Sequence, residues 1–193
     1  MPDPQAIQTK LEKKLKPGRY QHTLGVMYTA AALAMCHGTD LQEAILSGLL
    51  HDCGKYGSVQ EQMNFCKEHE IKLTQAELNI PALIHAKIGA YLAEYEYKIK
   101  NPRILNAILY HTTGKPDMNL LEKIVYLADF MEPGRKMIPA LPEVRSLAFH
   151  EIDRAVCLCA ESTLKYLDYT GAQVDPLTRM TYEFYKNQGC LPI

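Results

Sequence analysis

Apolar residues recur every three to four positions along nearly the whole chain of 193 residues. This spacing places them on one face of an α-helix, because a helix has 3.6 residues per turn. The clearest stretches are residues 24–35, 41–50, those after Pro81, those after Pro102, 117–131 and 142–167. Alternating runs of β-branched residues bounded by turns, the pattern of strands, are missing. We therefore predict an all-α fold.

Local signals mark where several of these helices begin and end. Gly38 favours a helix C-terminus because it adopts positive φ easily, and Asp40 can cap the next helix with its carboxylate. Pro81 and Pro102 suit the first turn of a helix, where a missing N–H costs nothing. Connectors are short except at 55–58 and 132–141, and no repeat or linker divides the chain. We predict a single domain, a helical bundle spanning residues 1–193.

The charge balance limits the classes of partner. The chain has 21 Lys and Arg against 22 Asp and Glu, a formal net charge of -1. Nucleic acids and anionic membranes attract a surplus of positive charge, so we expect neither as a partner. A small phosphorylated ligand remains compatible, because it needs only a few local cations.

The N-terminus lacks the basic-then-apolar order of a signal peptide, and no apolar run reaches the length of a membrane span. The six cysteines form no Cys-x-x-Cys motif. We therefore expect a cytoplasmic protein whose thiols are reduced and mostly buried.

Six titratable residues stand at helix ends or on apolar helix faces: His22, His51, Asp52, His85, His111 and Asp129. Each alone is compatible with a purely structural role, such as a core histidine with one hydrogen bond. Together they would bury several imidazoles and carboxylates, and a divalent cation supplies the compensating charge. Their nitrogen and oxygen ligands suit Fe, Mn, Co, Ni or Zn, whereas a structural zinc site would favour cysteines.

Polar residues next to these six could contact a phosphorylated substrate. Lys55 and Arg135 are the cations that we expect to neutralise phosphate, and the planar guanidinium of Arg135 matches two phosphate oxygens. Thr112 and Thr113 could donate hydroxyl hydrogen bonds, and Gly114 permits close backbone approach. In the alternative interpretation the two cations are solvated and the threonines only end a helix. For five other residues we expect a solvated surface position: His37, His69, Lys115, Arg145 and His150. The same expectation holds for Lys136.

The order of His22, the pair His51-Asp52 and Asp129 resembles the H…HD…D signature of the HD-domain superfamily of metal-dependent phosphohydrolases. The runs His-Thr-Thr-Gly at 111–114 and Ala-Asp-Phe-Met-Glu-Pro-Gly-Arg at 128–135 make the likeness more specific. They resemble the bacterial YqeK-like subgroup, the symmetrical diadenosine tetraphosphate hydrolases. The resemblance covers residues 18–178.

This resemblance implies a helical HD domain with two divalent metal ions, iron first among them, that cuts diadenosine tetraphosphate into two ADP. It implies that one metal is held by His22, His51, Asp52 and Asp129. Asp52 would bridge to a second metal, held also by His85 and His111. Together with our interpretation of the neighbouring polar residues, we expect Asp52, Lys55 and Arg135 to be catalytic, and Lys55, Arg135, Thr112, Thr113 and Gly114 to bind the substrate. The resemblance also suggests a homodimer.

Three alternatives keep this residue pattern. Some HD-domain proteins are mixed-valence di-iron oxygenases with similar ligands. A non-catalytic nucleotide or metal sensor could retain the fold, although it would not need a complete ligand set. The substrate could also be another nucleotide, such as a guanosine polyphosphate or a nucleoside triphosphate. Cyclic dinucleotides are disfavoured, since the Gly-Tyr-Pro element of that branch is absent. Lys55, Arg135 and the 111–114 turn favour a phosphohydrolase.

Overall fold

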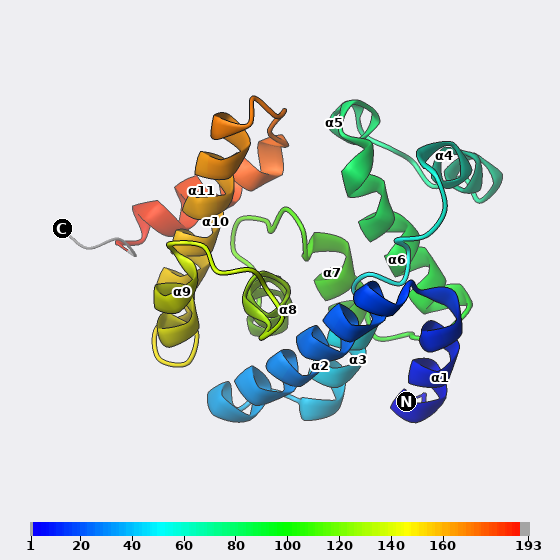
Figure 1. Cartoon of the computed structure of the whole chain (residues 1–193), viewed down its shortest axis with the longest axis horizontal. Coiled ribbons are helices and arrows are strands. Elements are labelled where there is room, and N and C mark those ends of the chain that lie inside the picture. Colours follow the sequence, from blue (N-terminus) through cyan, green and yellow to red (C-terminus); the bar gives the residue numbers. More distant parts are fainter. Residues whose placement is uncertain (1, 190–193) are drawn as a thin grey trace.

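The computed structural model describes residues 2–189, and within them every regular element is a helix. Figure 1 shows these elements. They are α1 (Pro4–Lys14), α2 (Pro17–His37), α3 (Leu41–Leu50), α4 (Val59–Glu68), α5 (Gln75–Asn79), the 3₁₀ turn η1 (Pro81–Leu83), α6 (Ile84–Tyr95), α7 (Pro102–Tyr110), α8 (Leu120–Met131), α9 (Leu141–Leu147), α10 (Ile152–Tyr169) and α11 (Pro176–Asn187). The all-α prediction is confirmed.

The centre of the fold is formed by α2, α3, α7 and α8, which all pack against one another or a shared neighbour. Their inward side chains, among them Leu33, Leu46 and Ile108, are fully buried. The helices α2 and α3 approach closely because of Gly48, where a Cβ would lie 2.9 Å from the Cα of Met27. A larger residue would force these helices apart.

Two groups of helices flank this centre. In Figure 1 α8 is seen end-on, with α9, α10 and α11 on one side and α4, α5 and α6 on the other. A smaller apolar cluster containing Cys66, Ile84 and Ile88 holds α4 against α6. On the other side, the buried Tyr185 of α11 accepts a hydrogen bond of 3.0 Å from the amide of Met118. This bond fixes α11 to the segment that leads into α8.

The expected boundary signals around α3 are confirmed. Gly38 ends α2 in the left-handed conformation, with φ of 71°. The Asp40 carboxylate accepts a hydrogen bond of 2.8 Å from the amide of Glu43 and so caps α3. Pro102 begins α7 as predicted, whereas Pro81 begins the 3₁₀ turn that precedes α6.

The prediction of one long helix over residues 142–167 is wrong, because α9 and α10 are separate helices. Side chains at the end of α2 form hydrogen bonds with backbone carbonyls of the segment between these two helices. The imidazole of His37 hydrogen-bonds the carbonyl oxygen of Ala148 at 2.7 Å, and the Cys36 thiol donates to that of Phe149 at 3.2 Å. These tertiary contacts replace helical hydrogen bonds, and Glu151 adopts a non-helical conformation with φ of -138° and ψ of 68°.

The surface prediction is confirmed for His150 but wrong for His37 and His69, which are both half-buried. The ring of His69 packs against Phe65 and lies 3.0 Å from the hydroxyl of Tyr91. The surface prediction failed for His69 because it was based on the charged neighbours of this residue. Those neighbours face solvent, whereas the ring of His69 packs inward.

Four of the five described cysteines are buried, as predicted; the exception is Cys36. Cys190 lies outside the described residues. Across residues 2–189, no helix is long and apolar enough to span a membrane.

Candidate metal centre

The fold brings all six predicted ligand residues to one centre. His22 comes from α2, His85 from α6 and Asp129 from α8, whereas His51, Asp52 and His111 directly follow α3 and α7. The turn after α3 lies against α6 because of Gly54. A Cβ at Gly54 would lie 2.3 Å from the carbonyl oxygen of His85, so only glycine allows this approach.

The Asp52 carboxylate separates the histidines into two pairs. Its Oδ2 lies 3.5 Å from Nε2 of His51 and 4.0 Å from Nε2 of His22. Its Oδ1 lies 3.3 Å from Nε2 of His85 and 3.6 Å from Nε2 of His111. One carboxylate thus presents one oxygen to each pair, which is the arrangement of a bridging ligand.

Two sets of donor atoms are close enough to surround an ion. In His22, His51 and Asp129 the donor atoms lie within 4.8 Å of one another, and Nε2 of His22 is 3.0 Å from Oδ1 of Asp129. Those of His51, Asp52 and His111 also lie within 4.8 Å of one another. Nε2 of His85 lies 3.2 Å from that of His111 and so extends the second set.

Hydrogen bonds to Nδ1 orient every imidazole of the centre. Nδ1 donates to the carbonyl oxygen three residues earlier at 2.7 Å for His51, 2.5 Å for His85 and 2.7 Å for His111. For His22 the acceptor is instead Oε1 of Glu132, at 3.1 Å. Since carbonyl and carboxylate oxygens only accept, each ring carries its proton on Nδ1. Nε2 is therefore the ring nitrogen that faces the centre and would bind a cation.

The centre is buried and contains polar atoms without partners. Among the described residues Nε2 of His22, Nε2 of His51 and Oδ1 of Asp52 are buried and lack a hydrogen-bond partner. Unpaired buried polar atoms are costly, and a divalent cation between them would satisfy all three. The residues present therefore fit a metal ion.

The protonation states of the centre also suit a cation. Burial acts to raise the pKa of Asp52, but His51 and His111 outweigh it and hold the pKa well below its usual value. Burial likewise opposes ionisation of Asp129, while His22 and His51 keep the pKa of that carboxyl low. Burial, helped by the neighbouring His111, lowers the pKa of His85 to about 3. The carboxylates are thus charged and His85 is neutral at pH 7, the forms that bind metals.

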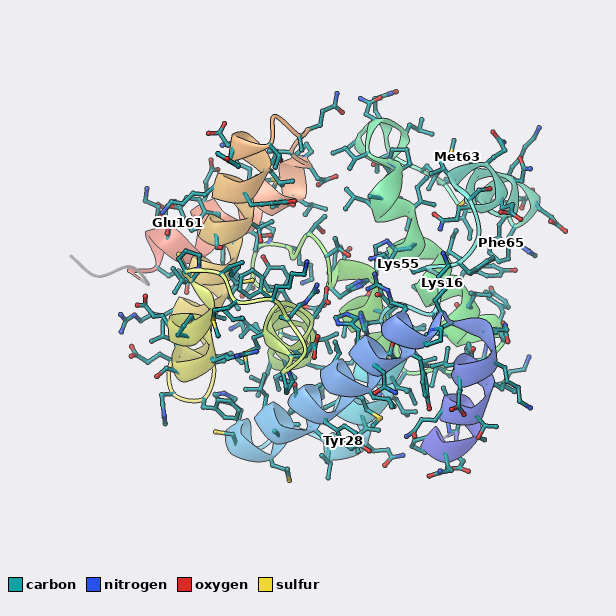
Figure 2. All side chains as sticks on the ribbon, in the orientation of Figure 1. Lys16, Tyr28, Lys55, Met63, Phe65 and Glu161 are labelled. Atoms are coloured by element: carbon teal, nitrogen blue, oxygen red, sulfur yellow. The ribbon has the colours of Figure 1, made fainter. Side chains whose placement is uncertain are left out.

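Three cations contact the carboxylates of the centre. Arg19 donates from Nη1 to Oδ2 of Asp52 at 2.7 Å, and Arg135 donates from Nη2 to Oδ1 of Asp129 at 2.5 Å. Nζ of Lys55 lies 3.7 Å from Oδ1 of Asp52. Figure 2 places Lys55 beside α6, near the beginning of α2. The predicted Lys55 and Arg135 therefore lie at the centre, whereas Arg19 was not predicted. The sequence feature that could have identified Arg19 is its position one helical turn before His22.

A cavity of about 550 Å³ borders the centre at His22, and its lining also includes Arg19, Arg135 and Lys136. We call it the cationic mouth. The positive charge of Arg19, Arg135 and Lys136 on its wall suits an anionic ligand.

The turn after α7 contributes one hydroxyl to the centre. Oγ1 of Thr112 lies 3.0 Å from Nε2 of His111 and 3.4 Å from Nε2 of His85. By contrast, the hydroxyl of Thr113 donates to the carbonyl of Gly114, and Gly114 has φ of 64°. A Cβ at Gly114 would lie 2.7 Å from Cγ2 of Thr181 on α11. Gly114 thus supports the turn and its packing.

Two residues expected to be solvated instead tie elements together. Arg145 donates from Nε to the carbonyl of Met131 at 3.0 Å and from Nη2 to that of Glu132 at 2.9 Å. Nζ of Lys115 lies 3.0 Å from Oε2 of the buried Glu122. Sequence reasoning also missed Glu132 itself, which faces the centre from the end of α8.

Comparison with known proteins gives consistent matches. The HD domain family model matches residues 19–134. A relative from Bacillus subtilis, named "Bis(5'-nucleosyl)-tetraphosphatase, symmetrical", is 36% identical over 90% of this chain and 92% of its own length. A relative of the same name from Halalkalibacterium halodurans is 39% identical over 85% of this chain and 87% of its own.

A solved structure has the same fold. It is described as a predicted HD superfamily hydrolase involved in NAD metabolism from Clostridium acetobutylicum. It is 32% identical to this chain, covers 97% of this chain and 99% of its own, and superposes with a TM-score of 0.92. With the family model covering more than half of the chain and near-complete coverage of its relatives, this chain belongs to the HD domain family.

Proposed function

We propose that this protein is a metal-dependent phosphohydrolase that cleaves diadenosine tetraphosphate symmetrically into two ADP. The observation that carries the proposal is the Asp52 carboxylate, which presents one oxygen to each pair of histidines beside a cationic mouth. The names of the two bacterial relatives support the substrate and the symmetrical cut.

The proposed centre holds two divalent metal ions. His22, His51 and Asp129 would bind one ion together with Oδ2 of Asp52. Oδ1 of Asp52 would bind the other ion, together with the imidazoles of His85 and His111. We propose iron first, because imidazole and carboxylate ligands suit it, with Mn, Co, Ni and Zn as alternatives. When bound, two such ions would supply activation of a water for hydrolysis and neutralise negative charge on the phosphate.

Cations beside the centre would bind the polyphosphate. In the structure Arg19, Arg135 and Lys55 rest against carboxylates whose charge a metal ion would neutralise. Once that charge is shared with a metal, the guanidinium groups are available to phosphate oxygens, where their planar forks form paired hydrogen bonds. We propose that Lys55 and Arg135 stabilise charge on the reacting phosphate, beside the bridging Asp52.

The turn at 111–114 would complete the substrate site. The Thr112 hydroxyl is already within hydrogen-bond distance of the centre and would donate to a phosphate oxygen. We propose that Thr113 and Gly114 take part through the shape of this turn. A cytoplasmic location and a homodimer stay predictions, which cell fractionation and sedimentation of the purified protein would test.

Product analysis tests the proposed reaction. The protein, loaded with Fe²⁺ and freed of dioxygen, is incubated with diadenosine tetraphosphate, and the nucleotides are separated by chromatography. We expect ADP as the sole product. AMP with ATP would contradict the symmetrical cut, and a requirement for dioxygen would favour the oxygenase alternative. No turnover with any of the five metals would overturn the hydrolase proposal.

A further inference from the structure

An apolar pocket adjoins the cationic mouth on the side of α10. It has a volume of about 800 Å³. Phe130 and Ile138 line both cavities, so the two lie on either side of a wall formed by these side chains. Phe130 directly follows Asp129, which places the shared wall next to the metal centre. We call this cavity the Tyr166 pocket, after one of the two tyrosines on its α10 wall.

The walls of the Tyr166 pocket expose an unusual amount of apolar surface. Tyr166 is 66% exposed, Tyr169 is 91% exposed and Ile138 is 39% exposed. Pro139 and Leu158 continue the apolar wall between them. A cluster of exposed aromatic and aliphatic side chains that borders a polar cavity is a common mark of a ligand site.

The order of the two cavities matches the order of groups in a nucleotide. Arg19, Arg135 and Lys136 line the part beside the metal centre, where phosphates would lie. The apolar part begins beyond Ile138, where a base linked to those phosphates would extend. Aromatic side chains bind bases of any sequence by stacking on their faces.

We propose that the Tyr166 pocket binds one nucleobase of the dinucleoside polyphosphate, with Tyr166 as the stacking residue; this rests on the proposed function. The rim also carries polar groups that could bind the edge of a base. Glu161 and Lys165 line the pocket and form an ion pair of 2.9 Å, and Ser162 lies between them in the sequence. Glu161 and Lys165 both belong to α10, and Glu161 is labelled in Figure 2.

Equilibrium binding to the metal-loaded protein tests this subsite. Calorimetry compares ADP, which has a base, with inorganic pyrophosphate, which has none. Tyr166→Ala should weaken ADP binding by roughly 5- to 150-fold, the usual loss for one stacked base, and leave pyrophosphate binding unchanged. Tyr28→Ala is the matched control, because Tyr28 is 65% exposed and lies on α2, away from α10 in Figure 2. It should change neither affinity.

Kinetics with diadenosine tetraphosphate give a second readout. Tyr166→Ala and Ile138→Ala should raise KM and leave kcat within about twofold, because the base is remote from the bond that breaks. Circular dichroism melting verifies that both variants fold.

Equal loss of ADP and pyrophosphate binding in Tyr166→Ala, or no loss of either, would overturn the subsite. A change of sedimentation mass without a change of ADP affinity would assign the pocket to contact between copies of the chain. The two proposals can also fail separately. If the wild-type protein does not hydrolyse the dinucleotide but Tyr166→Ala weakens ADP binding, the proposed reaction is refuted and the nucleobase subsite is supported.

Discussion

Glu132 should determine how tightly the His22 side of the centre holds its metal. Its carboxylate is almost fully buried, at 4% exposure, and receives hydrogen bonds from Nδ1 of His22 at 3.1 Å and from the amide of Gly134 at 2.6 Å. A carboxylate behind a histidine fixes the ring and raises its basicity. The other three imidazoles have backbone carbonyls in this place, so a side-chain substitution can test His22 separately.

Glu132→Ala removes this partner and frees the ring of His22. Loss of such a partner typically lowers metal affinity by about 10- to 100-fold, equivalent to about 1.4–2.7 kcal/mol. We therefore expect one cobalt ion to bind about 10- to 100-fold more weakly and the other to keep its affinity. The assay is competition with a chelator, followed by the visible spectrum of bound Co²⁺ and by plasma mass spectrometry of metal content.

Gly25→Ala tests the same carboxylate without changing Glu132 or His22. A Cβ at Gly25 would lie 2.4 Å from Oε2 of Glu132, so the carboxylate must move. Gly18→Ala is the matched control on the same helix, because nothing lies within 4 Å of a Cβ there. If Glu132→Ala and Gly25→Ala both retain two tightly bound ions while their melting temperatures confirm folding, Glu132 does not support His22.

Three other substitutions test the centre and the fold. Asp52→Asn should remove both ions and all turnover, because it leaves one weak ligand oxygen between the two histidine pairs. Metal content is measured by plasma mass spectrometry, and two retained ions would exclude the bridging role of Asp52. Arg135→Ala should lower kcat/KM for diadenosine tetraphosphate by about 10- to 100-fold, as expected for a lost charged hydrogen bond. An unchanged kcat/KM in steady-state kinetics would mean that Arg135 only supports Asp129. Tyr185→Phe leaves the amide of Met118 without its acceptor and should lower the free energy of unfolding by about 1–3 kcal/mol, measured in urea; no change would show that water replaces the hydroxyl.

The helical class and most of the candidate centre were predictable from the sequence because both depend on local patterns. Apolar periodicity reports which face of a helix is buried, and His22 or Asp129 on such a face needs a partner wherever the helix packs. Gly38 and Asp40 act on residues three or four positions away, so their effects on α2 and α3 were also readable.

Features that depend on long-range contacts were missed. The break between α9 and α10 depends on His37 and Cys36 of α2, which are more than a hundred residues away in the chain. Glu132 gains its role from His22 at a separation of 110 residues. The Tyr166 pocket joins α10 to the segment after α8 and leaves no local motif. No periodicity within one helix encodes such pairings.

The central claim is that six residues from five segments hold two metal ions bridged by Asp52. Anomalous diffraction at the absorption edge of the bound metal, from crystals of the metal-loaded protein, tests it most directly. We predict two peaks, one among His22, His51 and Asp129 and one beside His85 and His111, with Asp52 between them. A single peak, or none within ligand distance of Asp52, in crystals of active protein would contradict the binuclear centre.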